Sequence, residues 1–331
     1  MAAPARDASS DSEDEKLLEC GACRRFFAQT PAGSAVGARL EYDLPVRGRA
    51  PLRVHVSCWA PRAATATATA TADPAAICRY VSDATAFVAR QPWAHLDARI
   101  SNLTVRVHLT PLRKRWCARE ARIRPCSINS GVTTYDATHR TVDVYRSEDV
   151  FKVLLHELLH VFEVDRLVPR NTRRESEAVV EALALLLYLL ILVPSSSARA
   201  RLERERAWMQ RQARFLASHP WTSSTSPWSY IVCKTALLSA RALPHFLQWL
   251  NLASSRGDSA ARRAWPAVRD LALSARTDRS AVPDPVGDEA ARDAAPDACL
   301  SMSLTVHQLA LRPRSGGATD PRAGVATDPR R

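Results

Sequence analysis

The stretch Phe151–Asp165, FKVLLHELLHVFEVD, decides how the rest of the chain is interpreted. Its apolar residues predict a helix, which contains the H-E-x-x-H motif of His156, Glu157 and His160. Residues four apart on a helix lie about 40° apart around the axis and about 6 Å along it, so the two imidazoles can hold one metal ion. Glu157 projects to the side where a water on that metal would lie. The motif therefore predicts a zinc hydrolase helix with two ligands and a general base.

The composition indicates a globular core with polar tails. Of the 331 residues, 46% are hydrophobic, and the formal net charge is +12. This charge comes mainly from Arg and suits a nucleic-acid or other acidic partner, although GC-rich coding also produces Arg- and Ala-rich chains. Residues 1–16 contain no apolar signal segment, and Glu181 interrupts the longest apolar run. We expect an intracellular protein, cytoplasmic or nuclear, that is not secreted and has no membrane partner.

Changes in composition divide the chain into five segments. Residues 1–16 are acidic and polar and are expected to be disordered. Residues 17–61 contain paired Cys and His residues, and residues 62–73 form an Ala/Thr-rich linker. Residues 74–252 are expected to form the catalytic domain. Residues 253–331, rich in Arg, Asp, Ala, Pro and Gly, are expected to form a largely disordered tail.

The hydrophobic patterns within residues 74–252 predict an α+β domain with a small mixed sheet. Strands are expected at residues 102–110, 122–135 and 141–145, and helices at residues 75–90, 175–193, 197–219, 230–242 and 245–252. Ser147 is expected to cap the His-bearing helix, with Glu148 and Asp149 in the first turn, where the helix dipole favours negative charge.

An acidic pair, Glu177 and Glu181, follows the motif, with sixteen residues between His160 and Glu177. The two carboxylates share one face of the expected helix. Apolar residues surround Glu181, so its carboxylate needs a cationic or hydrogen-bonding partner, and a zinc-bound imidazole would be suitable. An Arg is the alternative partner. Glu175 and Glu181 are rival third ligands, and Glu163 is less suited because it lies on the same helix as the two His.

The segment 74–252 resembles the gluzincin branch of zinc metallopeptidases. The resemblance depends on His156-Glu157-Leu-Leu-His160 and on Glu177-Ala-Val-Val-Glu181. It implies a zincin-like fold and a catalytic Zn²⁺ held by His156, His160 and Glu177. It also implies that Glu181 is a hydrogen-bonding partner of one ligand imidazole.

The implied function is that of a zinc-dependent metalloendopeptidase. Metal-activated water would hydrolyse peptide bonds of a protein or peptide substrate, with Glu157 as general base. Tyr230 is the candidate donor to the oxyanion, and His245 and Lys234 are weaker candidates. By analogy with the zincin fold, residues 132–135 would form an edge strand that pairs with the substrate backbone. The alternative is a catalytically inactive zincin-fold protein that binds DNA or a protein.

The N-terminal segment predicts a second, structural Zn²⁺ site. Cys20 and Cys23 form one pair, His55 and Cys58 form another, and each pair is separated by two residues. The long gap between the pairs and Trp59 after the last Cys resemble the zinc finger of the poly(ADP-ribose) polymerase type, which implies a DNA partner. A LIM-like finger with a protein partner is the alternative.

Overall fold

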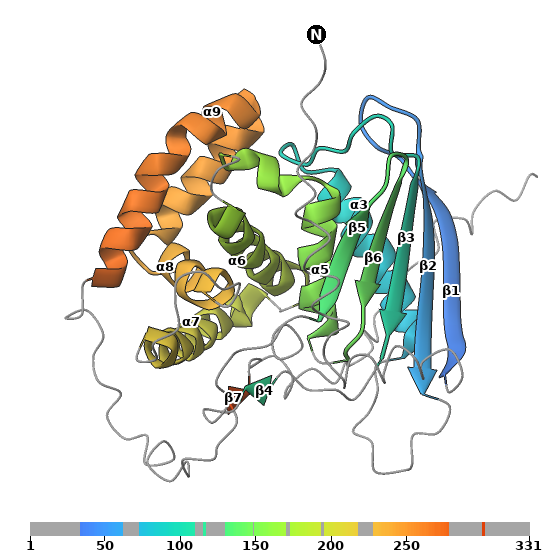
Figure 1. The fold of residues 1–331 in the computed structure, drawn as a ribbon, viewed down its shortest axis with the longest axis horizontal. Coiled ribbons are helices and arrows are strands. Elements are labelled where there is room, and N and C mark those ends of the chain that lie inside the picture. The colour runs from blue at the N-terminus through green and yellow to red at the C-terminus, as the bar shows by residue number, and fades with distance from the viewer. Residues whose placement is uncertain are drawn as a thin grey trace, which may run out of the picture.

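The computed structural model describes residues 34–61, 73–109, 115–116, 130–147, 149–169, 173–192, 195–217, 228–277 and 300–301. Within them, two helices cover one face of a five-stranded mixed sheet, and further helices lie on the far side of this pair (Figure 1). The expected α+β class with a small mixed sheet is confirmed.

The sheet has the strand order β1-β2-β3-β6-β5. The strand bounds are β1 Ser34–Leu44, β2 Leu52–Pro61, β3 Asn102–His108, β5 Gly131–Tyr135 and β6 His139–Val144. The strands β2, β3 and β6 are parallel, whereas β1 pairs antiparallel with β2, and β5 with β6. In the described part of the chain, β5 is therefore an edge strand. A separate two-stranded sheet joins β4 (Arg115–Trp116) to β7 (Leu300–Ser301).

Alternation along the central strands places the core on one face of the sheet. Leu103, Val105 and Val107 of β3 are fully buried, whereas the side chains between them are partly exposed. This face packs against α3 (Pro74–Ala89) and α5 (Val150–Val161). Asp73 begins α3 by accepting hydrogen bonds from the backbone N–H groups of residues 75 and 76, as expected for an N-cap.

The His-bearing helix α5 differs from its expected form at both ends. The expected cap at Ser147 is wrong, because the N-cap is Asp149, which has a left-handed backbone (φ 56°) and no side-chain capping bond. The helix also ends early, at Val161. Glu163 adopts a second left-handed conformation (φ 51°), and the chain continues into the 3-10 turn η2 (Val164–Leu167). Glu163 is therefore not on the helical stripe of the two His.

The remaining helices pack on the side of α5 away from the sheet (Figure 1). They are α6 Arg173–Leu192, α7 Ser195–Ala217, the π-helical segment η3 Trp228–Cys233, α8 Lys234–Leu237 and α9 Leu243–Thr277. The bounds of α6 and α7 agree with expectation to within a few residues, whereas the helix expected at 230–242 is π-helical at its start and short. Among the described residues, no helix has the length and apolarity to cross a membrane.

The folded part of the chain extends beyond the expected boundary at residue 252. The helix α9 turns at Gly257 (φ 75°), and its second arm packs back onto the first. Trp265 of the second arm is 1% exposed, and its ring centroid lies 5.0 Å from that of Trp249. Trp249 Nε1 donates a hydrogen bond to the carbonyl of Ala261. The expectation of a disordered tail is therefore wrong for residues 253–277, because apolar residues at helical spacing are buried there.

The expected separation between residues 17–61 and 74–252 is also wrong for the residues that are described. The strand β2 pairs with β3 from Arg53↔Asn102 to Trp59↔His108, so β1 and β2 belong to the same sheet as β3, β5 and β6. The expected acidic tail, residues 1–16, lies outside the described residues, as does most of the expected linker, residues 62–72.

We expect Trp265→Ala to destabilise the protein by about 3–5 kcal/mol, because the substitution empties a buried aromatic site. Urea denaturation would measure this loss. The matched control is Arg263→Ala, an exposed position on the same arm, where a change within about 0.5 kcal/mol is expected. Equal stabilities of the two variants would contradict the packing described for α9.

Candidate metal centre

Three expected ligands meet between α5 and α6. Nε2 of His156 lies 3.0 Å from Nε2 of His160, and Oε2 of Glu177 lies 3.7 Å from the first nitrogen and 3.5 Å from the second. All three ligand atoms lie within 4.8 Å of one another. The rival Glu175 does not join this group, because its carboxylate accepts a hydrogen bond from Trp265 Nε1 of α9.

Antiparallel packing of α5 and α6 explains why these residues meet. His156 and His160 lie one turn apart on α5, and Glu177 and Glu181 lie one turn apart on α6. Glu181 faces the earlier His and Glu177 faces the later one, so the two helices run in opposite directions. A group that could hold a metal ion is thus assembled from two helix stripes.

Each imidazole also has a carboxylate at its other ring nitrogen. Nδ1 of His156 lies 3.3 Å from Glu181 Oε1, and Nδ1 of His160 lies 2.9 Å from Asp165 Oδ2. An ionised carboxylate only accepts hydrogen bonds, so the proton of each ring belongs on Nδ1. In the neutral form of each ring, the Nε2 lone pair would then point into the space shared with Glu177. Burial opposes protonation of His160, but Asp165 and Glu177 outweigh it and raise the pKa of this imidazole well above its usual value.

The sequence predicted Glu181 in this role but missed Asp165. Asp165 lies five positions after His160 in the sequence. It reaches the ring only because α5 ends at Val161 and the turn η2 brings the chain back. A helix continuing to residue 165, as expected from the apolar pattern, would have carried Asp165 away from the ring.

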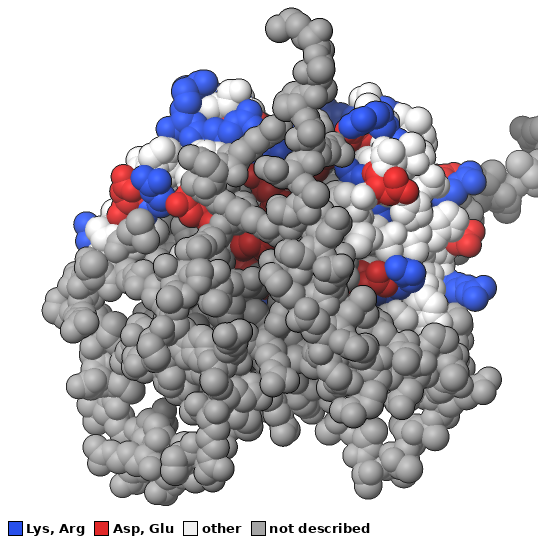
Figure 2. Space-filling view, in the orientation of Figure 1, with Lys and Arg blue, Asp and Glu red and all other residues white. Residues whose placement is uncertain are grey.

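The arrangement fits a divalent cation. Two imidazole nitrogens and one carboxylate oxygen converge, and either a metal ion or a proton on His160 would supply the positive charge that offsets their repulsion. Carboxylates outnumber ammonium groups beside the two imidazoles: Glu157, Asp165, Glu177 and Glu181 against Lys152 and Lys234. Figure 2 shows acidic side chains near the middle of this face, where grey atoms do not cover it. A His₂Glu donor set suits zinc.

The expected general base, Glu157, is buried against the edge strand β5. Thr133 Oγ1 of β5 lies 2.7 Å from Glu157 Oε2, to which it donates a hydrogen bond. Gly131 provides space on the same strand, since a Cβ atom there would lie only 2.7 Å from Glu157 Oε1. Burial raises the pKa of the Glu157 carboxyl, and the nearby imidazoles and the Thr133 hydroxyl oppose this shift in part. The strand therefore fixes both the position and the proton affinity of this carboxylate.

The two carboxylates of α6 are held in their charged forms. Burial alone would raise the pKa of Glu177, but the imidazoles of His160 and His156 outweigh it and lower the pKa to about 2. Burial likewise opposes ionisation of Glu181, yet two neighbouring lysines bring its pKa well below the usual range. Glu177 can therefore serve as an anionic ligand, and Glu181 as an acceptor for an imidazole.

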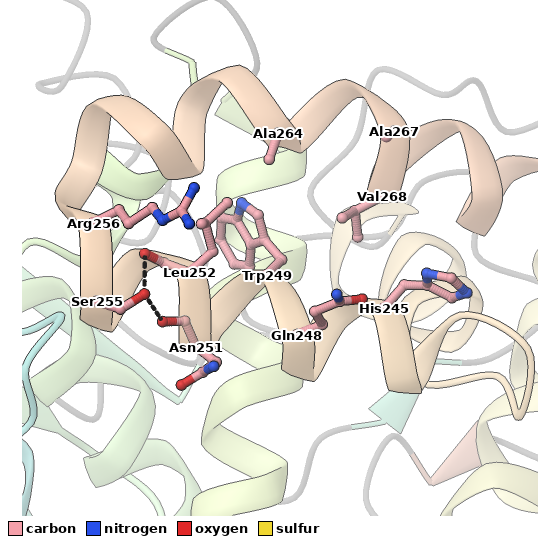
Figure 3. Close-up of a pocket in the computed structure, with 10 residues that line it drawn as sticks. All are labelled: His245, Gln248, Trp249, Asn251, Leu252, Ser255, Arg256, Ala264, Ala267 and Val268. Carbon is pink, nitrogen blue, oxygen red and sulfur yellow. Dashed lines mark hydrogen bonds between the residues drawn. The ribbon is translucent and has the colours of Figure 1, made fainter.

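The three oxyanion candidates are not assembled at the centre by any described contact. Tyr230 belongs to η3, and its side chain lies outside the described residues. Lys234 donates its hydrogen bond to Glu181 Oε2. His245 lines a groove on α9 together with Trp249 and Val268, and this groove includes none of the residues of the His/Glu centre (Figure 3).

His55 and Cys58 do not form the second half of a zinc site. Both lie in β2, where positions of opposite parity point to opposite faces of the sheet. Cys58 is in the core, and burial raises its pKa to about 12, whereas His55 is partly exposed and lies 3.3 Å from Glu41. The expected zinc finger is therefore wrong for this pair, because a regular strand separates the two ligands. Cys20 and Cys23 lie outside the described residues.

Comparisons with protein-family models, with curated proteins and with solved structures found no match to this chain. The inference of function therefore depends on the residues of the His/Glu centre and on their geometry.

We expect His160→Ala to lose one equivalent of bound zinc, because it removes one of the three converging ligand atoms. Metal analysis of the purified protein after dialysis against Zn²⁺ would measure the loss. Cys58→Ala is the control and should retain the zinc content of the wild type, since Cys58 is buried on the sheet. Zinc loss in Cys58→Ala with retention in His160→Ala would contradict the assignment.

Proposed function

We propose that the protein is a zinc-dependent metallopeptidase with its centre between α5 and α6. The observation that carries the proposal is the convergence of His156, His160 and Glu177 beside the anchored carboxylate of Glu157. A zincin-like fold is part of the proposal. The position of β5, an antiparallel edge strand in contact with the H-E-x-x-H helix, supports it.

The residues would divide the reaction among them. His156, His160 and Glu177 would hold the ion, which when bound polarises the scissile carbonyl and lowers the pKa of water at the site to about 7. Glu157 takes the proton of the attacking water and passes it to the leaving amine. Thr133 occupies one oxygen of Glu157 through its hydroxyl, which leaves Oε1 to accept that proton.

The edge strand β5 favours a peptide as the substrate. Residues of odd number on this strand face α5, since Thr133 contacts Glu157 and Tyr135 OH lies 3.4 Å from the carbonyl oxygen of His160. On the side away from β6, no partner strand is present among the described residues. A peptide that added to this edge would pass directly beside the general base.

We expect Glu157→Gln to retain zinc and to lose peptide hydrolysis by about 10²–10⁴-fold, since the amide cannot accept the proton of water. Cleavage of an internally quenched peptide library by the zinc-loaded protein would measure the rate. Hydrolysis at the wild-type rate by Glu157→Gln would exclude Glu157 as the base. Zinc binding without hydrolysis by the wild type would instead favour an inactive binding protein.

We expect Thr133→Val to lower kcat by about tenfold, because Glu157 loses the hydrogen bond that orients it. That bond also lowers the pKa of Glu157, so its loss should raise this pKa. Hydrolysis requires the ionised carboxylate, and the acidic limb of the kcat–pH profile should therefore move to higher pH.

The matched control is Thr134→Val, an exposed position next along β5 that points to the other face of the sheet. This variant should retain the wild-type kcat and pH profile. The same change in both variants would assign the effect to the strand as a whole and not to the bond with Glu157.

A further inference from the structure

The contact between α5 and α6 extends one turn beyond the proposed ligands. Lys152 lies four residues before His156 on α5 and thus on the same stripe. Its Nζ lies 3.6 Å from Glu181 Oε2, while the other oxygen of Glu181 lies 3.3 Å from His156 Nδ1. Glu181 therefore connects an ammonium group to a ligand imidazole.

A second lysine reaches the same carboxylate from another helix. Lys234 of α8 donates a hydrogen bond to Glu181 Oε2 at 3.2 Å. The side chains of Lys152 and Lys234 are only 12% and 10% exposed. Both ammonium groups contact this one carboxylate, and burying each of them is costly. Packing alone would be satisfied at lower cost by apolar side chains.

Other buried charged side chains also lie near the two lysines. On α7, Arg201 and Glu205 are buried and pair with each other at 3.1 Å, so they nearly compensate one another. Asp149 and Glu205 also act on Lys152 and keep it charged. The carboxylate that both lysines contact directly, however, is Glu181.

We propose that Lys152 and Lys234 are positioning residues of the metal centre. Together they hold Oε2 of Glu181, which leaves Oε1 for His156 Nδ1 and so directs the Nε2 lone pair of His156 toward the other ligands. Lys234 also ties α8, and with it the adjoining segment η3, to the metal centre. The inference rests on the proposed function in that it requires the His/Glu centre to bind metal, but it does not require peptidase activity.

The experiment compares the dissociation constant for Zn²⁺ of the full-length wild type with that of Lys234→Met, by competition with a chelator. Removing a partner of this kind typically weakens metal binding by about 10–100-fold, and we expect a loss of this size. Lys234→Arg, which keeps the charge and the donor, should recover part of it. The Co²⁺-loaded wild type and the Co²⁺-loaded Lys234→Met variant should differ in visible absorption, because the orientation of His156 changes.

Two further variants distinguish a positioning role of Lys234 from a general destabilisation of α8. Arg206→Met is the matched control, because Arg206 donates to the carbonyl of Leu238 at the end of α8 but does not contact Glu181. It should keep the wild-type affinity for zinc. In a Glu181→Gln background, Lys234→Met should cause little additional loss, because the lysine acts through Glu181.

The outcomes distinguish the two proposals. Wild-type affinity in Lys234→Met, or equal losses in Lys234→Met and Arg206→Met, would overturn the positioning role and leave the metal centre intact. A folded wild type that binds no Zn²⁺ at this centre would overturn both. Lys152→Met tests the same claim from a different helix, so the result does not depend on the folding of one variant.

Discussion

The structure depends on the antiparallel packing of α5 against α6, which places basic and acidic side chains opposite each other in one buried line. Lys152 and His156 face Glu181, and His160 faces Glu177. Each of these groups would be costly to bury alone, and each is stabilised by its neighbours. A slip of one helical turn would leave charges unpaired at both ends, so these charges contribute to the register of the two helices.

The sheet contributes to the centre from the other side of α5. Its apolar face anchors the helix, while the edge strand β5 reaches the general base through Thr133 and Gly131. The proposed ligand Glu177 and the proposed base Glu157 thus have different neighbours, since α6 carries Glu177 and β5 contacts Glu157.

Local spacing in the sequence predicted much of this site. The separation of four residues sufficed to place His156 with His160, and the apolar surroundings of Glu181 correctly indicated a buried partner. The missing parts depend on where elements end and on tertiary contacts. Asp165 needed the early end of α5, which a continuous apolar pattern conceals. The zinc site expected at His55 and Cys58 was wrong, because both residues lie in the strand β2 and their side chains point to opposite faces of the sheet. The second arm of α9 was missed because its Ala- and Arg-rich composition is typical of polar tails, although Trp265 is at its centre.

The second arm of α9 also contacts α6, because Trp265 Nε1 donates a hydrogen bond to the carboxylate of Glu175. Glu175 lies two residues before Glu177, in the first turn of α6, so α9 supports the end of the helix that presents the anionic ligand. The proposed metal centre therefore depends on parts of the chain that are far apart in sequence. A chain shortened at residue 252 would keep both imidazoles and Glu177 but would lose this contact at the start of α6.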